Sequence, residues 1–418
     1  MAATVPGAQT VGVPGQIQKK PWFKRVLGLL PEQNETELYA IFKADKLSRF
    51  YVPAVMMGHD SPPPPSSRTV HILGKDQRSL FLSHALHGIY DSVKAIHLAK
   101  DSPYKNISGN EGVRKSGGWI ESNVGLEEAT EPDGDEGQIS NLVVTGRPSD
   151  TVKMLNQVKH RVDDRTAVLF LQDGLGVAEA ANNEVFKDVE RRPSIVLGHM
   201  SHSLAYDRRT NSIKLMGPNN ATMLTGVRPY TGRKPDATET WLRSQGMLEK
   251  FASSEMLQAK GMALDSWMKH KIPSLMFSAV VDPICVMLDY RYEQLLSNPT
   301  ATKLTAQLLD EIADVVARMF EVKQSPELQA MLRGEGMRKQ IIGRIRAKGS
   351  APSMMKLQIQ RGMLTDIDYL NGFFIERGHR LGLKLPANEM IVGMVKAKHK
   401  AQVQRHRSYI PLEVTSRR

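Results

Sequence analysis

The sequence predicts an α/β domain with a parallel sheet, followed by an all-helical domain. In the first half of the chain, short apolar runs alternate with helix-length segments, which is typical of parallel strands joined by crossover helices. From about residue 240 onward, the apolar residues recur with the spacing of a helix instead. A ligand site is expected in the cleft between two such domains.

Length and composition limit the class of protein. With 418 residues, of which 41% are hydrophobic, the chain can bury a large core and suits about two or three domains. No apolar run approaches the roughly 18 residues that a membrane-spanning helix needs, so we expect no transmembrane segment. The single cysteine, Cys285, excludes an internal disulfide framework and a multi-cysteine metal site, and we predict no metal site.

The positive charge is concentrated near the C-terminus. The chain has a formal net charge of +12, and residues 331–418 hold 18 lysines and arginines against 6 acidic residues. The preceding part is therefore close to neutral. Such a concentration of basic residues is typical of contact with RNA or another anionic surface, so one interpretation is RNA binding through the C-terminal half. The alternative is that these residues are solvated faces of surface helices.

Residues 1–67 are predicted to form an N-terminal extension. The first 31 residues contain no acidic residue but carry Lys19, Lys20, Lys24 and Arg25 near apolar residues, which is compatible with an organelle transit peptide. A mitochondrial matrix location is therefore predicted, with an ordinary N-terminal tail and a cytoplasmic location as the alternative. SPPPPSS at 61–67 is typical of a stiff linker, so the folded part is expected to begin at residue 68.

Residues 68–240 are predicted to form the α/β domain. Its strands are expected at TVHILG, VKAIHLAK, NLVVTG, TAVLFLQDG, SIVLGHMSHSLAY and NSIKLMG. Helices are expected after the first strand and at TVKMLNQVKHRV. The segment of about 101–138 is rich in glycine, serine, asparagine and acidic residues, and we predict a mobile surface insertion there.

Residues 241–400 are predicted to form the helical domain, and residues 401–418 a basic tail. KIPSLMFSAVVDPICVMLDY is expected to be a buried helix that is interrupted at Pro283, because proline lacks the amide donor. TKLTAQLLDEIADVVARMFE has apolar residues at i, i+3 and i+4. Two more helical stretches, SMMKLQIQRGMLTDIDYLNGFFIERGHRLGL and EMIVGMVKAKHKAQVQRH, complete this half.

The first strand runs into an incomplete dinucleotide-binding fingerprint in HILGKDQRSLFLSHAL, residues 71–86. Such a turn needs glycine at three offsets, because the turn must tighten, the backbone must approach the pyrophosphate and the helix must pack on the strand. Those offsets hold Gly74, Asp76 and Ser79. Asp76 would place a negative charge where a phosphate approaches the helix N-terminus. The fingerprint is therefore reduced to its first glycine.

Several strings resemble the ketopantoate reductase family over about residues 68–400. They are LFLQDGLGV, GHMSH, SLMFSAVVDPICVMLDYRYEQLLSNP and SMMKLQIQRGMLTDIDYLNGFFIERGHRLGLKLPANEMIVGMVK. The resemblance implies an N-terminal Rossmann-like domain with a parallel sheet, followed by an all-helical domain like the C-terminal domain of 6-phosphogluconate dehydrogenase. It also implies NADPH-dependent reduction of 2-dehydropantoate and a homodimer formed through the helical half.

The catalytic positions that the resemblance implies have changed. The family carries a lysine and two asparagines at i, i+4 and i+8 of the interdomain helix, and these positions hold Ser274, Ser278 and Asp282. Serine cannot replace an ammonium group that donates a proton and stabilises an alkoxide, and Asp282 would repel a keto acid. Lys269 and Lys271 lie nearby, but they precede Pro273 and occupy other helix faces, so we expect neither to substitute.

The resemblance also implies positions for substrate and cofactor. The remaining substrate positions are Ser353 and Asp366, the latter in place of a glutamate. The family's turn asparagine is replaced by Asp173, while His202 is retained. Turn geometry and helix capping can explain the retained residues, so we predict that no cofactor is required, with NADP as the alternative. The candidate cofactor-binding residues are Gly74, Lys100, Arg147, Gly174 and Gly176.

Three functions follow as hypotheses. The first is a non-catalytic protein of mitochondria, resembling a degenerate fungal branch of the family that activates translation of cytochrome b mRNA with the mitochondrial ribosome. The second is an NADPH-dependent 2-dehydropantoate 2-reductase, or a related 2-keto acid reductase, with Lys269 or Lys271 as the acid and with Arg147 and Lys100 contacting the cofactor. The third is a structural protein whose basic tail binds an acidic protein or a lipid head group.

Overall fold

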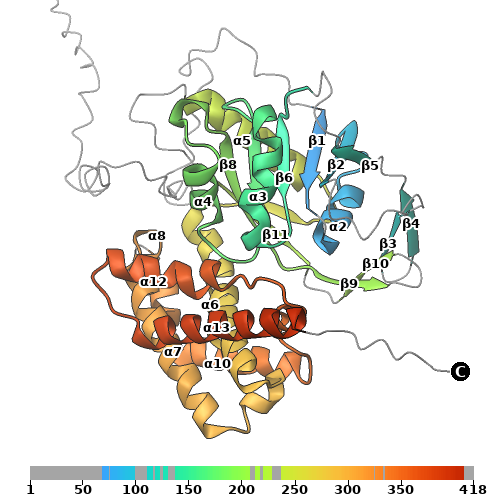
Figure 1. The fold of residues 1–418 in the computed structure, drawn as a ribbon. Coiled ribbons are helices and arrows are strands. Elements are labelled where there is room, and N and C mark those ends of the chain that lie inside the picture. The colour runs from blue at the N-terminus through green and yellow to red at the C-terminus, as the bar shows by residue number, and fades with distance from the viewer. Residues whose placement is uncertain are drawn as a thin grey trace, which may run out of the picture.

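The computed structural model of the chain describes residues 68–74, 76–98, 111–115, 118–122, 126–129, 137–207, 212–216, 220–227, 237–323, 325–332 and 335–408. These residues form two lobes, one containing the sheets and one built from helices (Figure 1). The predicted fold class, an α/β domain followed by a helical domain, is confirmed. The predicted N-terminal extension and its proline-rich linker lie outside the described residues.

An eight-stranded sheet forms the centre of the first lobe. Its strands are β1 (Thr69–Leu73), β2 (Ser92–Leu98), β5 (Leu126–Ala129), β6 (Asn141–Val144), β7 (Ala167–Phe170), β8 (Ser194–Met200), β11 (Thr222–Val227) and β12 (Ala259–Gly261). In space their order is β12-β11-β8-β7-β6-β1-β2-β5. The strands from β8 to β5 are parallel to their neighbours, as predicted, whereas β11 runs antiparallel to β8.

A second sheet lies beside the first and has the order β4-β3-β10-β9. Its strands are β3 (Glu111–Lys115), β4 (Gly118–Ser122), β9 (Ser203–Asp207) and β10 (Ser212–Met216). Three strands, β3, β4 and β5, come from the segment of about 101–138 that was expected to be a surface insertion. They are strands because distant partners supply their backbone hydrogen bonds: β5 pairs with β2, and β3 pairs with β10.

Helices cover both faces of the main sheet. The helices are α2 (Gln77–Ala85) and α5 (Ala237–Ala252) on one face, and α3 (Pro148–Val158) and α4 (Val177–Glu184) on the other. Strand β6 shows the period of two that this arrangement requires: Leu142 and Val144 pack with α3 and α4, and Val143 packs on the opposite face. The α/β lobe extends past the domain boundary expected at residue 240, because α5 spans that boundary and packs on the sheet and β12 pairs with β11.

The interdomain helix α6 (Leu264–Leu288) is continuous, so the interruption predicted at Pro283 is wrong. A proline removes the donor for the carbonyl four residues earlier, which here is that of Ala279. The side chain of Asn371 donates to this carbonyl oxygen at 2.8 Å. The missing helical hydrogen bond is therefore replaced from another part of the chain.

Helix α6 is long and apolar enough to cross a membrane by length and composition alone. However, 78% of its most apolar window is buried inside the protein, and α6 lies at the centre of the helical lobe (Figure 1). Its hydrophobicity is therefore explained by its place in the core.

The other helices of the second lobe surround α6. They are α7 (Pro299–Arg318), α8 (Phe320–Lys323), α9 (Pro326–Leu332), α10 (Glu335–Lys348), α11 (Met354–Gln360), α12 (Asn371–Arg380) and α13 (Pro386–Arg407), with short 3-10 turns η4 (Tyr292–Leu295) and η5 (Ile367–Tyr369). Residues 401–407, expected to begin a basic tail, continue α13. One set of buried apolar residues runs from the α3 and α4 face of the sheet into this lobe without a break.

Candidate functional site

The order of the main sheet fixes where a ligand would bind. The chain passes from β1 to β2 on one side and later to β6 on the other side of β1, so the strand order reverses between β1 and β6. In open α/β sheets, ligands bind at such a point, outside the carboxyl ends of the strands. Gly74 follows β1, and Thr145 follows β6. A Cβ atom on Gly74 would lie 2.0 Å from the Thr145 Oγ1 atom, so packing between the two strand ends alone requires this glycine.

The N-terminus of α2 is closed by a side chain of the same turn. Asp76 is the residue that caps the helix, and its Oδ1 atom accepts a hydrogen bond from the backbone N–H of Ser79 at 3.1 Å. The Ser79 hydroxyl donates in turn to the Asp76 carbonyl oxygen at 2.6 Å. Backbone N–H groups at a helix N-terminus attract phosphate, but here a carboxylate already lies among them.

Arg78 crosses the carboxyl end of the sheet. Its guanidinium donates to the Leu171 carbonyl oxygen at 3.2 Å and to Asp173 Oδ2 at 2.5 Å. Leu171 and Asp173 follow β7, which is separated from β1 by β6. Arg78 lies in the first turn of α2, which follows β1, so its side chain joins this turn to the turn after β7. The Arg78 side chain is 24% exposed and that of Asp173 is 68% exposed, so the arginine is largely covered while the carboxylate faces solvent.

The glycine turn after β7 packs directly on the helical lobe. Gly174 and Gly176 have φ values of +95° and +85°, which glycine adopts readily. A Cβ atom on Gly174 would lie 2.9 Å from both the carbonyl oxygen and the Cβ of Tyr369, and the Leu175 N–H donates to the same carbonyl at 3.0 Å. The geometry of the two candidate cofactor glycines is therefore required by the contact between the lobes.

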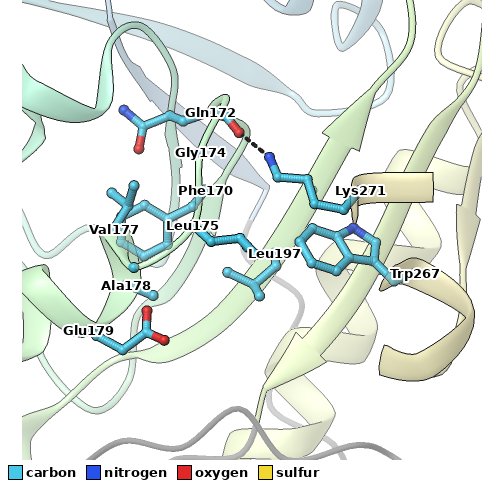
Figure 2. A pocket seen from close by; sticks show the side chains of 12 residues that line it. Phe170, Gln172, Gly174, Leu175, Val177, Ala178, Glu179, Leu197, Trp267 and Lys271 are labelled. Carbon is cyan, nitrogen blue, oxygen red and sulfur yellow. Dashed lines mark hydrogen bonds between the residues drawn. The ribbon is translucent and has the colours of Figure 1, made fainter. Parts of the chain in front are cut away.

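A small pocket lies between this turn and α6 and encloses about 310 Å³, part of it open to solvent. Figure 2 shows Trp267 and Lys271 of α6 on one side and Val177, Ala178 and Glu179 of α4 on the other. Phe170, Leu175 and Leu197 make the wall between them apolar. Because this volume includes space open to solvent, the enclosed part of the pocket is too small for a drug-sized ligand.

The two lysines of α6 that were not expected to substitute for the family's catalytic lysine lie in different surroundings. Lys269 forms an ion pair with Glu327 at the surface. Lys271 is 3% exposed, and its Nζ donates to the Gln172 carbonyl oxygen at 2.6 Å, as the dashed line in Figure 2 marks. Because α6 continues through Pro273, Lys271 is directed toward the glycine turn.

Burial and charge tune the groups around Lys271. Burial lowers the pKa of Lys271 to about 8, against the opposing charge of Asp173. Desolvation resists ionisation of Asp173, but the charges of Arg78 and Lys271 hold the pKa of its carboxyl down at about 2. Burial, followed by the charge of Lys271, lowers the pKa of His199 to about 3. Arg78, Asp173 and Lys271 thus form a line of alternating charge from α2 to α6.

Three of the positions that the family resemblance assigns to substrate lie together in a closed network. Asp282 Oδ1 accepts a hydrogen bond from the Tyr292 hydroxyl at 2.7 Å, and the hydroxyls of Ser278 and Ser353 lie beside its carboxyl. Burial raises the pKa of Asp282 to about 6, although the bond from Tyr292 opposes the shift. Ser274 is half-buried on α6. The carboxyl of Asp282 is thus engaged by neighbouring side chains.

Asp366 and Arg147 join the two lobes. Asp366 Oδ1 accepts from the Ser149 N–H at 3.1 Å, and Arg147 donates to the Leu364 carbonyl oxygen at 3.0 Å. Arg147 also pairs with Asp150 in the first turn of α3. Burial raises the pKa of Asp366, with the bond from Ser149 opposing it. Both predicted site residues thus act in interdomain contacts, and Lys100 lies outside the described residues.

A second ionic contact between the lobes lies at the far side of the pocket. Arg377 of α12 pairs with Glu179 at 3.3 Å and lies 3.8 Å from Glu321. Burial raises the pKa of Glu179, and the charge of Arg377 opposes the shift.

His202, which the family resemblance retains, packs on Phe81 with 5.1 Å between ring centroids. Its Nε2 atom also bonds to the Met256 carbonyl oxygen at 3.1 Å.

The structure therefore brings Gly74, Gly174 and Gly176 to one edge of the sheet, and it places Ser278, Asp282 and Ser353 in a separate cluster. Sequence reasoning missed Arg78 and Tyr292. Arg78 stands one residue before Ser79 in the altered fingerprint. An arginine inside that turn is the sequence feature that could have identified it as a site residue. In the described part of the chain, no group of three or more His, Cys, Asp or Glu side chains could hold a metal ion.

Two family models match the chain in the order of the two lobes. Residues 82–226 match the model for ketopantoate reductase PanE/ApbA, and residues 266–399 match the model for its C-terminal domain. Together the two matches cover more than half of the chain. The chain belongs to the ketopantoate reductase PanE/ApbA family.

Curated members of the ketopantoate reductase family are distant relatives. A probable 2-dehydropantoate 2-reductase of Schizosaccharomyces pombe is 21% identical over 266 residues, which cover 62% of this chain and 74% of the relative. The 2-dehydropantoate 2-reductase of Saccharomyces cerevisiae is 21% identical over 272 residues, covering 59% of this chain and 69% of the relative.

Several solved structures share the fold. D-mandelate dehydrogenase with NADH and anilino(oxo)acetate aligns with a TM-score of 0.58 and 20% identity, covering 80% of this chain and 99% of that protein. The dimeric ketopantoate reductase of Staphylococcus aureus aligns with a TM-score of 0.55 and 9% identity, again over 80% of this chain and 99% of that protein.

Proposed function

We propose that this chain is a non-catalytic member of the ketopantoate reductase family that acts in mitochondrial gene expression, as a ribosome-associated translational activator of cytochrome b mRNA. The buried network around Asp282 carries the first half of this proposal. Asp282, which stands where the family orients its substrate, is hydrogen-bonded to Tyr292 inside the protein instead, and Ser278 lies beside its carboxyl. A substrate would have to break this network to reach them.

The chemistry of carbonyl reduction also argues against catalysis. The reaction needs a group that donates a proton to the ketone oxygen and stabilises the developing negative charge. Ser274, at the position of the family's lysine, has neither the charge nor the acidity. The raised pKa of Asp282, about 6, still leaves this carboxyl largely ionised at neutral pH. An anionic keto acid bound at these positions would therefore meet a like charge.

The basic C-terminal half supports a nucleic-acid partner. The helices α10 and α13 carry cationic side chains that are exposed to solvent, which leaves them accessible to phosphate groups. They include Lys339, Arg346, Lys400, Arg405 and Arg407. The matrix location rests on the acid-free N-terminal segment, and ribosome association rests on the resemblance to the fungal branch. A homodimer of this chain is proposed from the relative that is described as dimeric.

Crosslinking to RNA in isolated mitochondria tests the proposed role. We expect cytochrome b mRNA among the crosslinked RNA, and a severalfold loss of crosslinking in the variant Lys400→Gln/Arg405→Gln/Arg407→Gln. The control Lys187→Gln/Arg191→Gln removes two exposed cations from the α/β lobe and should leave crosslinking unchanged. Absence of cytochrome b mRNA, or equal crosslinking by both variants, would contradict the proposal and favour an acidic protein or a lipid head group as the partner.

A reductase remains the second candidate because of the position of Lys271. Its amine lies in the interdomain pocket, and a pKa of about 8 suits a proton donor near neutral pH. In this reading the Lys271 ammonium would donate to the carbonyl oxygen of 2-dehydropantoate or a related 2-keto acid. The amine would first have to leave the Gln172 carbonyl oxygen.

A direct assay separates the two candidates. Purified protein is mixed with NADPH and 2-dehydropantoate, and the absorbance of NADPH is followed. Our proposal expects no loss of absorbance above that of a denatured sample. Turnover that disappears in Lys271→Met but persists in Lys269→Met would establish the reductase and overturn the non-catalytic assignment.

A further inference from the structure

We infer that Arg78 occupies the dinucleotide cleft in place of a cofactor, so that the wild-type chain binds neither NADP nor NAD. This inference goes beyond the loss of catalysis, because a family member could lose its proton donor and still bind the nucleotide. The residues at the cleft do not fit a dinucleotide, and three separate contacts are responsible.

The first contact is the bridge that Arg78 makes over the end of β6. Its two hydrogen bonds, to the Leu171 carbonyl oxygen and to Asp173, join the turn after β1 to the turn after β7. The strand order reverses between β1 and β6, so the bridge lies over the point where a bound dinucleotide would cross the sheet. A nucleotide could enter only after both hydrogen bonds are broken.

The second contact is the Asp76 cap on α2. The N–H group of Ser79, which a phosphate would use, already donates to the Asp76 carboxylate. The carboxylate also brings a negative charge to the place where the pyrophosphate would lie. Entry of a phosphate would thus cost a hydrogen bond and a repulsion between like charges.

The third contact extends the bridge to the helical lobe. Asp173 lies between the charges of Arg78 and Lys271, and both lower the pKa of its carboxyl. Lys271 is fixed in turn on the Gln172 carbonyl oxygen. Asp173 follows Gln172 in the chain, so the bridge ends beside the contact of α6 with the glycine turn. The bridge belongs to the interdomain packing and is more than an isolated surface pair.

Restoring the fingerprint tests the inference. The variant Asp76→Gly/Arg78→Leu/Ser79→Gly removes the cap and the bridge and places glycine at all three offsets. Glycine at a helix cap costs only a few tenths of a kcal/mol relative to aspartate, so the helix should persist. We expect this variant to bind NADPH at least about tenfold more tightly than the wild type, the factor that corresponds to about 1.4 kcal/mol. Binding is read from NADPH fluorescence and from the midpoint of thermal unfolding.

The control is Arg165→Leu, which breaks the ion pair of the exposed Arg165 with the buried Asp163 in the same lobe and should bind no NADPH. The single variant Arg78→Leu, checked by circular dichroism, serves if the triple variant does not fold. Wild-type protein whose unfolding midpoint rises with NADPH would overturn the inference, and so would a folded Arg78→Leu or triple variant without a gain. Wild-type binding without turnover would refute only this inference, whereas binding with turnover would refute the proposed function as well.

Discussion

Asn371 supplies the hydrogen bond that Pro283 removes from helix α6. Its side-chain amide donates to the Ala279 carbonyl oxygen at 2.8 Å, and its second N–H donates to Asn388 Oδ1 at 2.9 Å. Asn388 in turn donates to Glu311 of α7 at 2.8 Å. The asparagines of the LNGF and PAN strings thus connect α6, α7, α12 and α13 through buried polar contacts. Their role in this chain is structural.

The first prediction concerns the coupling of Asn371 with Pro283. Asn371→Ala should lower the free energy of unfolding by about 2–4 kcal/mol, because it leaves buried acceptors without donors. In a Pro283→Ala background the amide of residue 283 can bond the Ala279 carbonyl itself, so the same substitution should cost at least about 1 kcal/mol less. Urea unfolding of the four proteins measures this difference. Equal costs in both backgrounds would show that the two residues act independently.

The second prediction contrasts two glycines. Gly174→Ala should destabilise the protein by about 2 kcal/mol or more, because the backbone has a positive φ and the new methyl group would meet Tyr369 at 2.9 Å. Gly393→Ala, on the exposed side of α13, has no atom within 4 Å of the new methyl group and should stabilise by about 0.5–1 kcal/mol. Denaturant unfolding of both variants checks the pair. A neutral Gly174→Ala would mean that the interdomain contact is loose.

The third prediction is a pH dependence that Lys271 causes. The pKa of Lys271 is lowered from 10.5 to about 8 in the folded protein, so the unfolded chain binds more protons between these values. The free energy of unfolding should therefore rise with pH across that window, by on the order of 1–3 kcal/mol relative to Lys271→Met. Unfolding curves at several pH values measure the difference. Lys269→Met, at the surface, is the control and should run parallel to the wild type.

The fourth prediction concerns Asp282, whose shift has the opposite consequence. Burial raises its pKa from 3.8 to about 6, so the folded protein binds more protons in this window. The free energy of unfolding should fall as the pH rises from about 4 to 6, by on the order of 1–3 kcal/mol, and Asp282→Asn should remove that component. Asp289→Asn is the control, since Asp289 is exposed and asparagine suits its positive φ of 58°. An unchanged pH profile in Asp282→Asn would exclude the assigned titration.

The sequence predicted the elements whose signals are local. The alternation of Leu142, Val143 and Val144 between the two faces of the sheet is visible in the letters of β6, and the parallel sheet follows from such runs. The strands in the segment of about 101–138 were missed, because polar strands such as β3 and β4 carry little apolar signal and form through pairing with one another and with β10.

The contacts that define the site are distant in sequence, and the sequence alone could not reveal them. Arg78 and Asp173 are 95 residues apart, and Lys271 and Gln172 are 99 residues apart. The break expected at Pro283 was a sound local inference that failed because Asn371, 92 residues from Ala279, compensates for it. The sequence did show that the catalytic positions had changed. It could not show that Tyr292 would hydrogen-bond Asp282, because that contact depends on the folded structure.

The apolar interior that continues from the α3 and α4 face of the sheet into the helical lobe has a consequence for dissecting the protein. A fragment ending at Gly261 would leave side chains such as Leu175 and Val177 without the packing partners that the helices provide. Each separated half would expose a large apolar surface to water and would therefore tend to aggregate. The two lobes differ in topology but share one apolar core. We therefore expect them to unfold together in a single cooperative transition.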